Sequence, residues 1–191
     1  MSTWELPRSA TINGREFPIR SDYRAALDAL SVLGDPGLDD HERGVLALTI
    51  LYPDAESMGP SDHGEAIEFA KWFLAGGDGA TKAPPVKLAD WEQDFPIIVG
   101  PVNRVLGYEA RAVPYDPEKN EGGLHWWTFL AAYNEVGDCL FAQVVSIRKK
   151  LAQGRRLEKH EQRFYREHRD LVDLKRKETP EEEQVLEHWI S

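Results

Sequence analysis

The sequence has few of the features that mark secreted, membrane-spanning or nucleic-acid-binding proteins. Its single cysteine, Cys139, excludes an internal disulfide and fits a reducing, cytosolic setting. No apolar run reaches the roughly 18 residues of a membrane span, and residues 1–5 lack the basic and apolar stretches of a secretory signal. The net charge of −10 predicts that no basic surface is left over to drive nucleic-acid binding. With 191 residues, 41% of them hydrophobic, the chain is long enough for one compact soluble domain or a small domain with an appendage.

Residues 1–20 predict a short β-hairpin. Residues 10–12 and 15–17 flank Asn13-Gly14, a dipeptide that favours the positive φ angles of a two-residue turn. Pro18 has no backbone N–H to donate, so the second strand is expected at the edge of its sheet.

Three helices are predicted in a helical subdomain at residues 21–76. Each begins near a residue whose side chain can accept a hydrogen bond from the first helical turn, and two have the Asp-x-x-Glu spacing of a capping box. Apolar residues recur every three or four positions within each helix. The expected starts and ends are Ser21-Asp22 and Gly34, Asp39 with Glu42 and Pro53, and Asp62 with Glu65 and Gly76.

A helical core is predicted at residues 88–154, after a glycine- and proline-rich linker at residues 77–87. Pro96 and Pro101 interrupt the helical pattern of residues 88–106, and a break or kink is expected at Pro101 because proline removes a backbone hydrogen bond. Residues 107–123 are expected to form a long surface loop. The apolar pattern of residues 124–151 predicts one buried helix about 42 Å long.

Residues 155–191 predict charged C-terminal helices. Opposite charges four positions apart can pair on the surface of such helices, and residues 179–182 have the capping signals of a last short helix. The expected pairs are Arg163/Glu167, Arg166/Asp170, Arg169/Asp173 and Asp173/Lys177. The expected fold class is therefore mainly α, with a short N-terminal β-hairpin and a charged C-terminal helical tail.

The side chains able to perform chemistry predict no catalytic, cofactor-binding or metal site. His41 lies among acidic residues, but this segment begins a helix, where acidic side chains complement the helix dipole. His160 and His168 are expected to be solvated, and no cation at helical spacing activates the thiol of Cys139.

Two adjacent tryptophans, Trp126 and Trp127, point about 100° apart on a helix. At least one indole is therefore expected to pack inside the protein. The other either packs between helices as well or faces a partner, because tryptophan is enriched at the centres of interfaces.

The same region carries a resemblance to a known family. Residues 124–129 are Leu-His-Trp-Trp-Thr-Phe, and residues 147–150 are Ile-Arg-Lys-Lys. These segments resemble the bacteriophage gene-product-fifteen family of tail-locus proteins, whose pattern is matched at Leu124, His125, Trp126, Trp127, Phe129 and Arg148. Further matching segments are the strand–turn–strand before Asp22-Tyr23-Arg24, Asp90-Trp91-Glu92 with Asp94, and Phe164-Tyr165.

The resemblance implies a non-enzymatic tail-assembly chaperone that acts in the host cytoplasm and is absent from the mature virion. Its implied partners are the tape measure protein and the tail-tube protein, without cofactor, nucleic acid or membrane, and a homo-oligomer is compatible with this role. A chaperone for a helical client needs exposed apolar surface. The thin apolar stripe of the tail is expected to supply it, or else to pack back on residues 124–151. The predicted partner-binding residues are Trp126, Leu157, Phe164, Tyr165, Leu171, Trp189 and Ile190.

Two other functions stay open at the level of the sequence. One is a structural virion component, such as a head–tail connector or a tail-completion protein. The other is a small cytosolic metal-dependent enzyme that uses His41 and neighbouring acidic residues.

Overall fold

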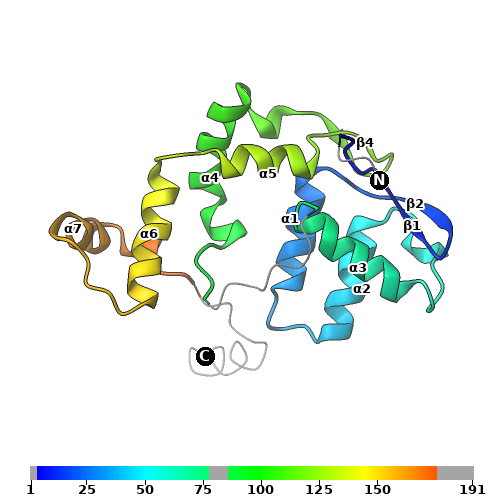
Figure 1. The fold of residues 1–191 in the computed structure, drawn as a ribbon, viewed down its shortest axis with the longest axis horizontal. Helices are drawn as coiled ribbons and strands as arrows, with labels where there is room; N and C mark the ends of the chain where they lie inside the picture. Colours follow the sequence, from blue (N-terminus) through cyan, green and yellow to red (C-terminus); the bar gives the residue numbers. More distant parts are fainter. Residues whose placement is uncertain (1–3, 78–85, 176–191) are drawn as a thin grey trace, which may run out of the picture. The chain divides into compact units, whose positions relative to one another are not determined.

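The computed structural model describes residues 4–77 and 86–175 (Figure 1). In this part the chain is mainly α-helical with a short N-terminal antiparallel β-hairpin, as the sequence predicts. The described residues form two compact units: unit 1 contains residues 4–77 and 111–130, and unit 2 contains residues 86–110 and 131–175. This division differs from the five consecutive segments expected from the sequence, because residues 111–130 pack with the N-terminal part of the chain.

The elements of unit 1 are two small hairpins and three α-helices, followed by the start of a fourth helix. They are β1 (Ser9–Ile12), β2 (Arg15–Pro18), α1 (Tyr23–Leu33), α2 (Asp40–Leu51), the 3₁₀ helix η1 (Ala55–Ser57), α3 (His63–Leu74), β3 (Tyr115–Asp116), β4 (Glu121–Gly122) and the first residues of α5 (Trp126–Asn134).

The elements of unit 2 are helical, and a short 3₁₀ helix, η2 (Ala110–Ala112), lies at its border with unit 1. They are α4 (Trp91–Leu106), the end of α5, α6 (Leu140–Ala152), α7 (Lys159–Glu167) and α8 (Arg169–Val172). Within the described residues, no helix combines the length and the apolar character that crossing a membrane requires.

The N-terminal hairpin forms as predicted. Asn13 and Gly14 both have positive φ, 47° and 75°, which matches the twist of a two-residue hairpin turn. β1 and β2 pair with Ala10 opposite Phe17, and both of these side chains are buried. The alternation of the strand therefore places one face of the hairpin against unit 1.

All three helices begin at the predicted N-cap residues, but only the first two have the predicted capping hydrogen bonds. Asp39 and Glu42 form the expected reciprocal capping box of α2, with hydrogen bonds of 2.8 and 2.9 Å. Asp62 makes no capping hydrogen bond to α3. It accepts hydrogen bonds from Asn13 Nδ2 and from Gly59 N, both at 2.8 Å. The capping-box prediction for α3 is wrong because tertiary contacts occupy this carboxylate.

Aromatic packing dominates the core of unit 1. The rings of Tyr23 and Phe129 stack with centroids 4.7 Å apart, and the rings of Trp126 and Phe129 stack at 5.8 Å. These three side chains are nearly inaccessible to solvent. Because they come from α1 and α5, the packing joins the N-terminal helices to residues more than 100 positions away in the chain.

The break predicted at Pro101 is not observed. α4 runs from Trp91 to Leu106 through both Pro96 and Pro101. Each proline removes one backbone hydrogen bond, but Ile98, Val99 and Val102 are buried along the same helix. Packing of this apolar face stabilises the helix despite the missing bonds.

The single helix predicted for residues 124–151 is wrong, since this segment forms two helices, α5 and α6. Gly137 lies between them with a φ of 61°, a left-handed conformation that glycine adopts without strain. Cys139 then caps α6 in an extended conformation, and its Sγ accepts from Ala142 N at 3.5 Å. Apolar periodicity continues across this turn because each helix buries a face of its own, so the pattern does not reveal the turn.

The long loop predicted at residues 107–123 contains regular structure. It includes η2 and the hairpin of β3 and β4, in which Tyr115 pairs with Gly122. Gly122 has a φ of 78°, and a Cβ there would collide with the backbone carbonyl of Pro114. The glycine and proline content therefore marks a tight turn instead of an open loop.

Candidate functional site

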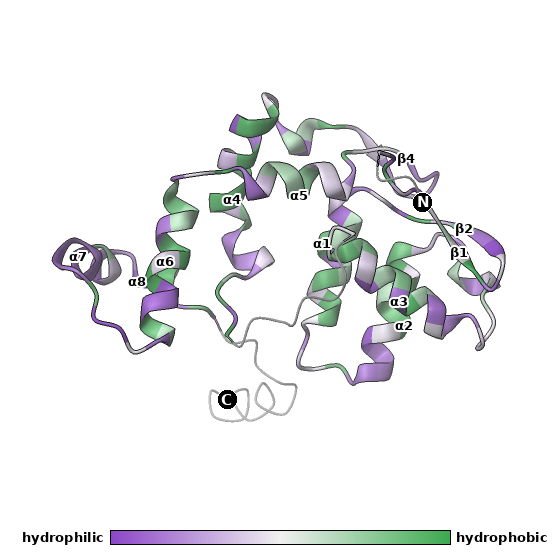
Figure 2. Cartoon of the chain, viewed as in Figure 1, coloured by the Kyte–Doolittle hydropathy of each residue, from purple (hydrophilic) through white to green (hydrophobic). Residues whose placement is uncertain are grey.

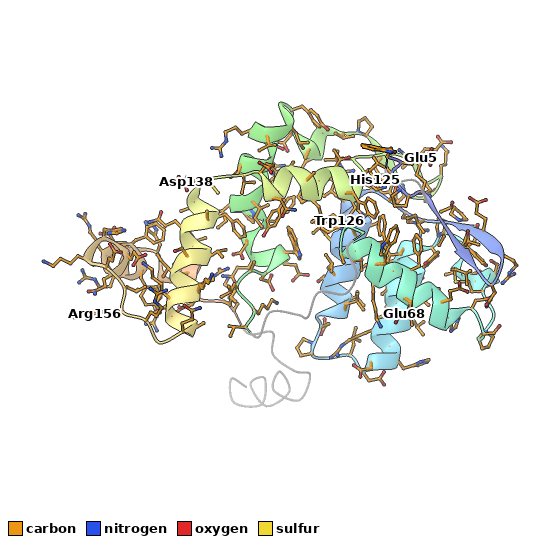
Figure 3. All side chains as sticks on the ribbon, viewed as in Figure 1. Glu5, Glu68, His125, Trp126, Asp138 and Arg156 are labelled. Atoms are coloured by element: carbon orange, nitrogen blue, oxygen red, sulfur yellow. The ribbon has the colours of Figure 1, made fainter. Side chains whose placement is uncertain are left out.

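The residues of the family resemblance in unit 1 lie at the start of α5, where His125 and Trp126 are labelled in Figure 3. His125 is buried, and its Nε2–H donates to the carbonyl of Pro7 at 2.8 Å while its Nδ1 accepts from Trp127 N at 3.1 Å. Burial lowers the pKa of His125 and keeps the ring neutral. A neutral ring is also required by the acceptor at Nδ1. His125 therefore holds backbone groups in place.

Trp126 and Trp127 both pack inside unit 1. Trp126 is only 1% exposed and its Nε1 donates to the carbonyl of Leu74 at 3.1 Å. Trp127 is half-buried, donates from Nε1 to the carbonyl of Phe73 at 2.8 Å, and meets the ring of Trp72 edge-on. The expectation of a partner-facing Trp126 is therefore not met. The alternative, that both indoles pack between helices, describes the structure.

Asp22 connects the start of α1 to the residue before His125. One carboxylate oxygen accepts from Arg24 N at 2.9 Å and caps α1, and the other accepts from Leu124 N at 2.7 Å. Tyr23 N donates in turn to the carbonyl of Leu124 at 2.9 Å. The side chain of Asp22 is fully buried, so these bonds supply the partners that a buried carboxylate requires.

Arg148, the position of the sequence resemblance that lies in unit 2, makes a buried ion pair with Asp94. Its Nη1 and Nη2 donate to the two carboxylate oxygens at 2.6 and 2.9 Å. The remaining N–H groups donate to the carbonyls of Leu88, Leu171 and Val172. Both charged side chains are at most 5% exposed. This guanidinium therefore joins three segments of unit 2.

The partner of Arg148 is missed when the sequence is considered by pattern alone. Arg148 follows the buried Ile147 and is one turn from the buried Val144, so a cation lies on the apolar face of α6. A charge at such a position signals a buried partner, but nothing local identifies Asp94, which is 54 positions away.

The apolar stripe of the charged tail packs within unit 2. Leu157 is buried in one cluster with Val144, Ile147 and Val172. The partly buried side chains that pack against this cluster include Phe164, Tyr165 and Leu171. The stripe thus covers α6, which was the alternative to a partner-binding role. Trp189 and Ile190 lie outside the described residues.

Two of the predicted ion pairs of the tail are present. Arg163 Nε lies 2.8 Å from Glu167, and Arg169 Nε lies 2.9 Å from Asp173. Glu167 holds the pKa of Arg163 above its ordinary value through this hydrogen bond. Three of the four side chains are largely exposed and Asp173 is partly exposed, so solvent screens both pairs and they contribute little to stability.

The described residues contain no arrangement that fits the metal-dependent alternative. In residues 4–77 and 86–175, no three His, Cys, Asp or Glu side chains come together as metal ligands would. His41 is exposed at the start of α2, beside the capping box of Asp39 and Glu42.

Unit 1 contains an open cleft of about 780 Å³. Two arginines in its wall donate to backbone carbonyls: Arg20 to those of Thr49 and Ile50 at 2.9 and 3.0 Å, and Arg24 to that of Val113 at 2.9 Å. The lining includes carboxylates but no serine, threonine, cysteine, lysine or histidine. Its polar side chains are those of Arg20, Arg24, Arg111, Asp28, Glu118 and Tyr115.

Comparisons with protein-family models, with curated proteins and with solved structures returned no match.

Proposed function

We propose that this protein is a phage tail-assembly chaperone that binds the tape measure protein, the tail-tube protein or both without performing a reaction. In this proposal it acts in the cytoplasm of the host and is left out of the finished virion. The resemblance of its sequence to the gene-product-fifteen family supports the proposal, and the chemistry of its surface is compatible with it.

The observation that carries the proposal is the place of the six resemblance positions in the framework of the fold. Five of them are buried and Trp127 is half-buried. The side-chain polar groups of His125, Trp126, Trp127 and Arg148 all make hydrogen bonds inside their own unit. Such positions favour a shared fold over a shared active site.

α2 offers apolar surface to a client. Val45 and Leu46 are adjacent on this helix and each is 41% exposed. Contiguous exposed apolar surface favours an interaction site, and these two side chains add to the exposed apolar surface of α2. An amphipathic helix of a client can place its apolar face on such a helix.

Co-expression with the tape measure protein of the same tail locus tests the proposal. The chaperone should raise the soluble yield of the tape measure protein and should co-purify with it. If the soluble yield does not rise and the two proteins do not co-purify, the proposal is contradicted. Mass spectrometry of purified particles provides a second test, because finding the chain there in stoichiometric amount would favour a structural virion component.

A double substitution locates the client surface. Val45→Gln with Leu46→Gln should lower the co-purified tape measure protein at least about threefold, since the loss of two apolar contacts weakens binding by roughly 1 kcal/mol or more. Val105→Gln with Leu140→Gln is the matched control, because these side chains are each 42% exposed in unit 2. Equal loss in both variants would place the client surface elsewhere.

A further inference from the structure

The charge of this acidic protein is unevenly distributed. Residues 149–169 contain eight Lys and Arg and three Glu, whereas the remaining residues contain fifteen Lys and Arg and thirty Asp and Glu. A net charge of +5 is therefore concentrated in 21 residues of a chain with a net charge of −10. In the structure these residues form the end of α6, the loop after it, all of α7 and the first residue of α8, all within unit 2. Figure 2 shows α7 as mainly hydrophilic.

Within the part of the chain that the structure describes, three of these eight cations make ion pairs. Lys150 pairs with Glu161 at 2.6 Å, and Arg163 and Arg169 make the surface pairs described above. Five other side chains are exposed and make no ion pair or hydrogen bond with any residue of the described ranges. They are Lys149, Arg155, Arg156, Lys159 and Arg166.

The fold orients the basic side chains of α7 in one direction. Lys159, Arg163 and Arg166 are spaced four and three residues apart, which places them on one face of the helix. The buried Glu161 and the partly buried Phe164 belong to the packed side of α7. Arg155 and Arg156 precede the helix in the loop after α6, where Figure 3 labels Arg156.

We propose that these residues form a basic surface that binds an acidic segment of a partner polypeptide. The basic surface consists of Lys149, Arg155, Arg156, Lys159, Arg163 and Arg166. The inference rests on the proposed function in one respect: the basic surface would be a contact of the chaperone with its protein client. All of these cations except Arg163 lack an ion pair with the described residues, so an acidic segment gains Coulomb energy from them. Arginine also pairs with carboxylates through two parallel hydrogen bonds.

Two observations favour a polypeptide over a nucleic acid. None of the six side chains of the basic surface is an aromatic ring on which a base can stack, and the rings of Phe164 and Tyr165 beside it are partly buried. A nucleic acid also extends far beyond the Debye length of about 8 Å. It therefore meets the field of a chain whose net charge is −10, whereas a short acidic segment is attracted by the basic surface alone.

Fluorescence anisotropy with the whole chain tests this inference. The probe is a fluorescein-labelled peptide of five Glu-Asp-Glu-Leu repeats, and the control probe has lysine at every acidic position. The acidic peptide should bind, and its affinity should fall at least about tenfold when salt is raised from roughly 50 to 200 mM, because surface charges are screened. Equal affinity for both peptides would overturn the inference.

Charge reversal distinguishes the basic surface from other cations. Arg155→Glu with Arg156→Glu should weaken binding of the acidic peptide at least about tenfold, because it replaces attraction by repulsion. Lys71→Glu with Lys119→Glu is the matched control, since both lysines are exposed in unit 1 and each makes one surface ion pair. The control should change the affinity less than about twofold.

A second variant and a second ligand complete the test. Lys159→Glu with Arg166→Glu should weaken binding as Arg155→Glu with Arg156→Glu does, and circular dichroism verifies that both variants are folded. Binding unaffected in both folded variants would overturn the inference. Tighter binding of 20-nucleotide oligothymidylate or of a 20-base-pair duplex than of the acidic peptide would also overturn it, in favour of a nucleic-acid surface.

The two proposals fail separately. The peptide assay contains no tape measure protein, so peptide binding by the wild type together with failed co-expression would retain the basic surface and contradict the tail-assembly role. Successful co-expression without peptide binding would retain the tail-assembly role and contradict the basic surface.

Discussion

At the scale of single residues, the buried polar side chains of the described residues differ in whether they make hydrogen bonds. The carboxylate of Asp22, the imidazole of His125 and the guanidinium of Arg148 all have hydrogen-bond partners inside their units. The hydroxyl of Tyr115 is the exception, since it is shielded from solvent and has no partner among the described residues. An unpaired buried hydroxyl costs stability.

Removing this hydroxyl should stabilise the protein. Tyr115→Phe is expected to raise the free energy of unfolding by about 1 kcal/mol, because the desolvated and unpaired group is lost while the ring remains. Urea unfolding followed by circular dichroism measures the change.

Tyr52→Phe is the matched control for that substitution. The hydroxyl of Tyr52 is buried and donates to the carbonyl of Ala66 at 3.0 Å, and burial raises the pKa of this hydroxyl. Its removal should lower the free energy of unfolding by about 1 kcal/mol. A decrease in the free energy of unfolding in both variants would show that Tyr115 has a hydrogen-bond partner in solution.

At the scale of elements, short-range chemistry starts the helices and strands while contacts between elements decide how they end and join. The hairpin turn at Asn13 forms from local preferences, but residues at the start of α3 then hold it in place. Asp62, just before α3, accepts from the side chain of Asn13, and Glu65, in its first turn, accepts from the backbone N–H of Asn13. The hydrogen bond from Asn13 is the largest of the causes that hold the pKa of Asp62 below its usual range. Contacts between elements can therefore give a side chain such as that of Asp62 other hydrogen-bond partners than the helix start it is predicted to cap.

Two glycines with positive φ should differ strongly in their tolerance of alanine. Gly123→Ala adds a Cβ that collides with the carboxylate of Asp22, which caps α1 and accepts from Leu124 N. Gly137→Ala places its Cβ in open space, so only the left-handed conformation is strained, at about 1 kcal/mol. Gly123→Ala should therefore lower the free energy of unfolding by at least about 2 kcal/mol more than Gly137→Ala does.

Urea unfolding of both glycine variants provides the comparison. Equal losses would contradict the role given to Asp22 in joining α1 to the start of α5. A loss at Gly137 larger than that at Gly123 would indicate that the turn between α5 and α6 carries more of the stability than its open surroundings suggest.

At the scale of the whole molecule, the described chain contains two units that each bury their own apolar residues. Phe129 and Tyr23 belong to the core of unit 1, whereas Val144 and Ile147 belong to that of unit 2. The chain passes from one unit to the other within α5, between Leu130 and Ala131. Local stability can therefore differ between the units.

A cavity in one core should loosen mainly the unit that contains it. Ile147→Ala removes a fully buried side chain and should cost roughly 2–5 kcal/mol of stability in unit 2. Hydrogen–deuterium exchange with mass spectrometry should then show that exchange, relative to the wild type, accelerates more in α6, α7 and α8 than in α1 and α3. Equal acceleration in all of these helices would show that the units unfold together.

The amino-acid sequence by itself determined the mainly helical fold class, the N-terminal hairpin and the starts of α1 and α2. Each of these depends on residues within about four positions of one another, such as Asn13 with Gly14 or Asp39 with Glu42, so local preferences are sufficient. Whether a predicted helix continues or is interrupted was harder to predict. Apolar periodicity does not show the turn at Gly137, and the penalty of Pro101 in α4 is outweighed by packing.

Only the tertiary structure decided how the candidate functional residues are used. Asp62 binds a turn 49 positions away, Asp22 joins Leu124 across 102 positions, and Arg148 pairs with Asp94 across 54. It also separated the buried Trp126 from the exposed cations of the basic surface. The physical reason is that burial and pairing depend on which distant segments meet, and the free energy of those contacts exceeds the local preferences that a sequence pattern records.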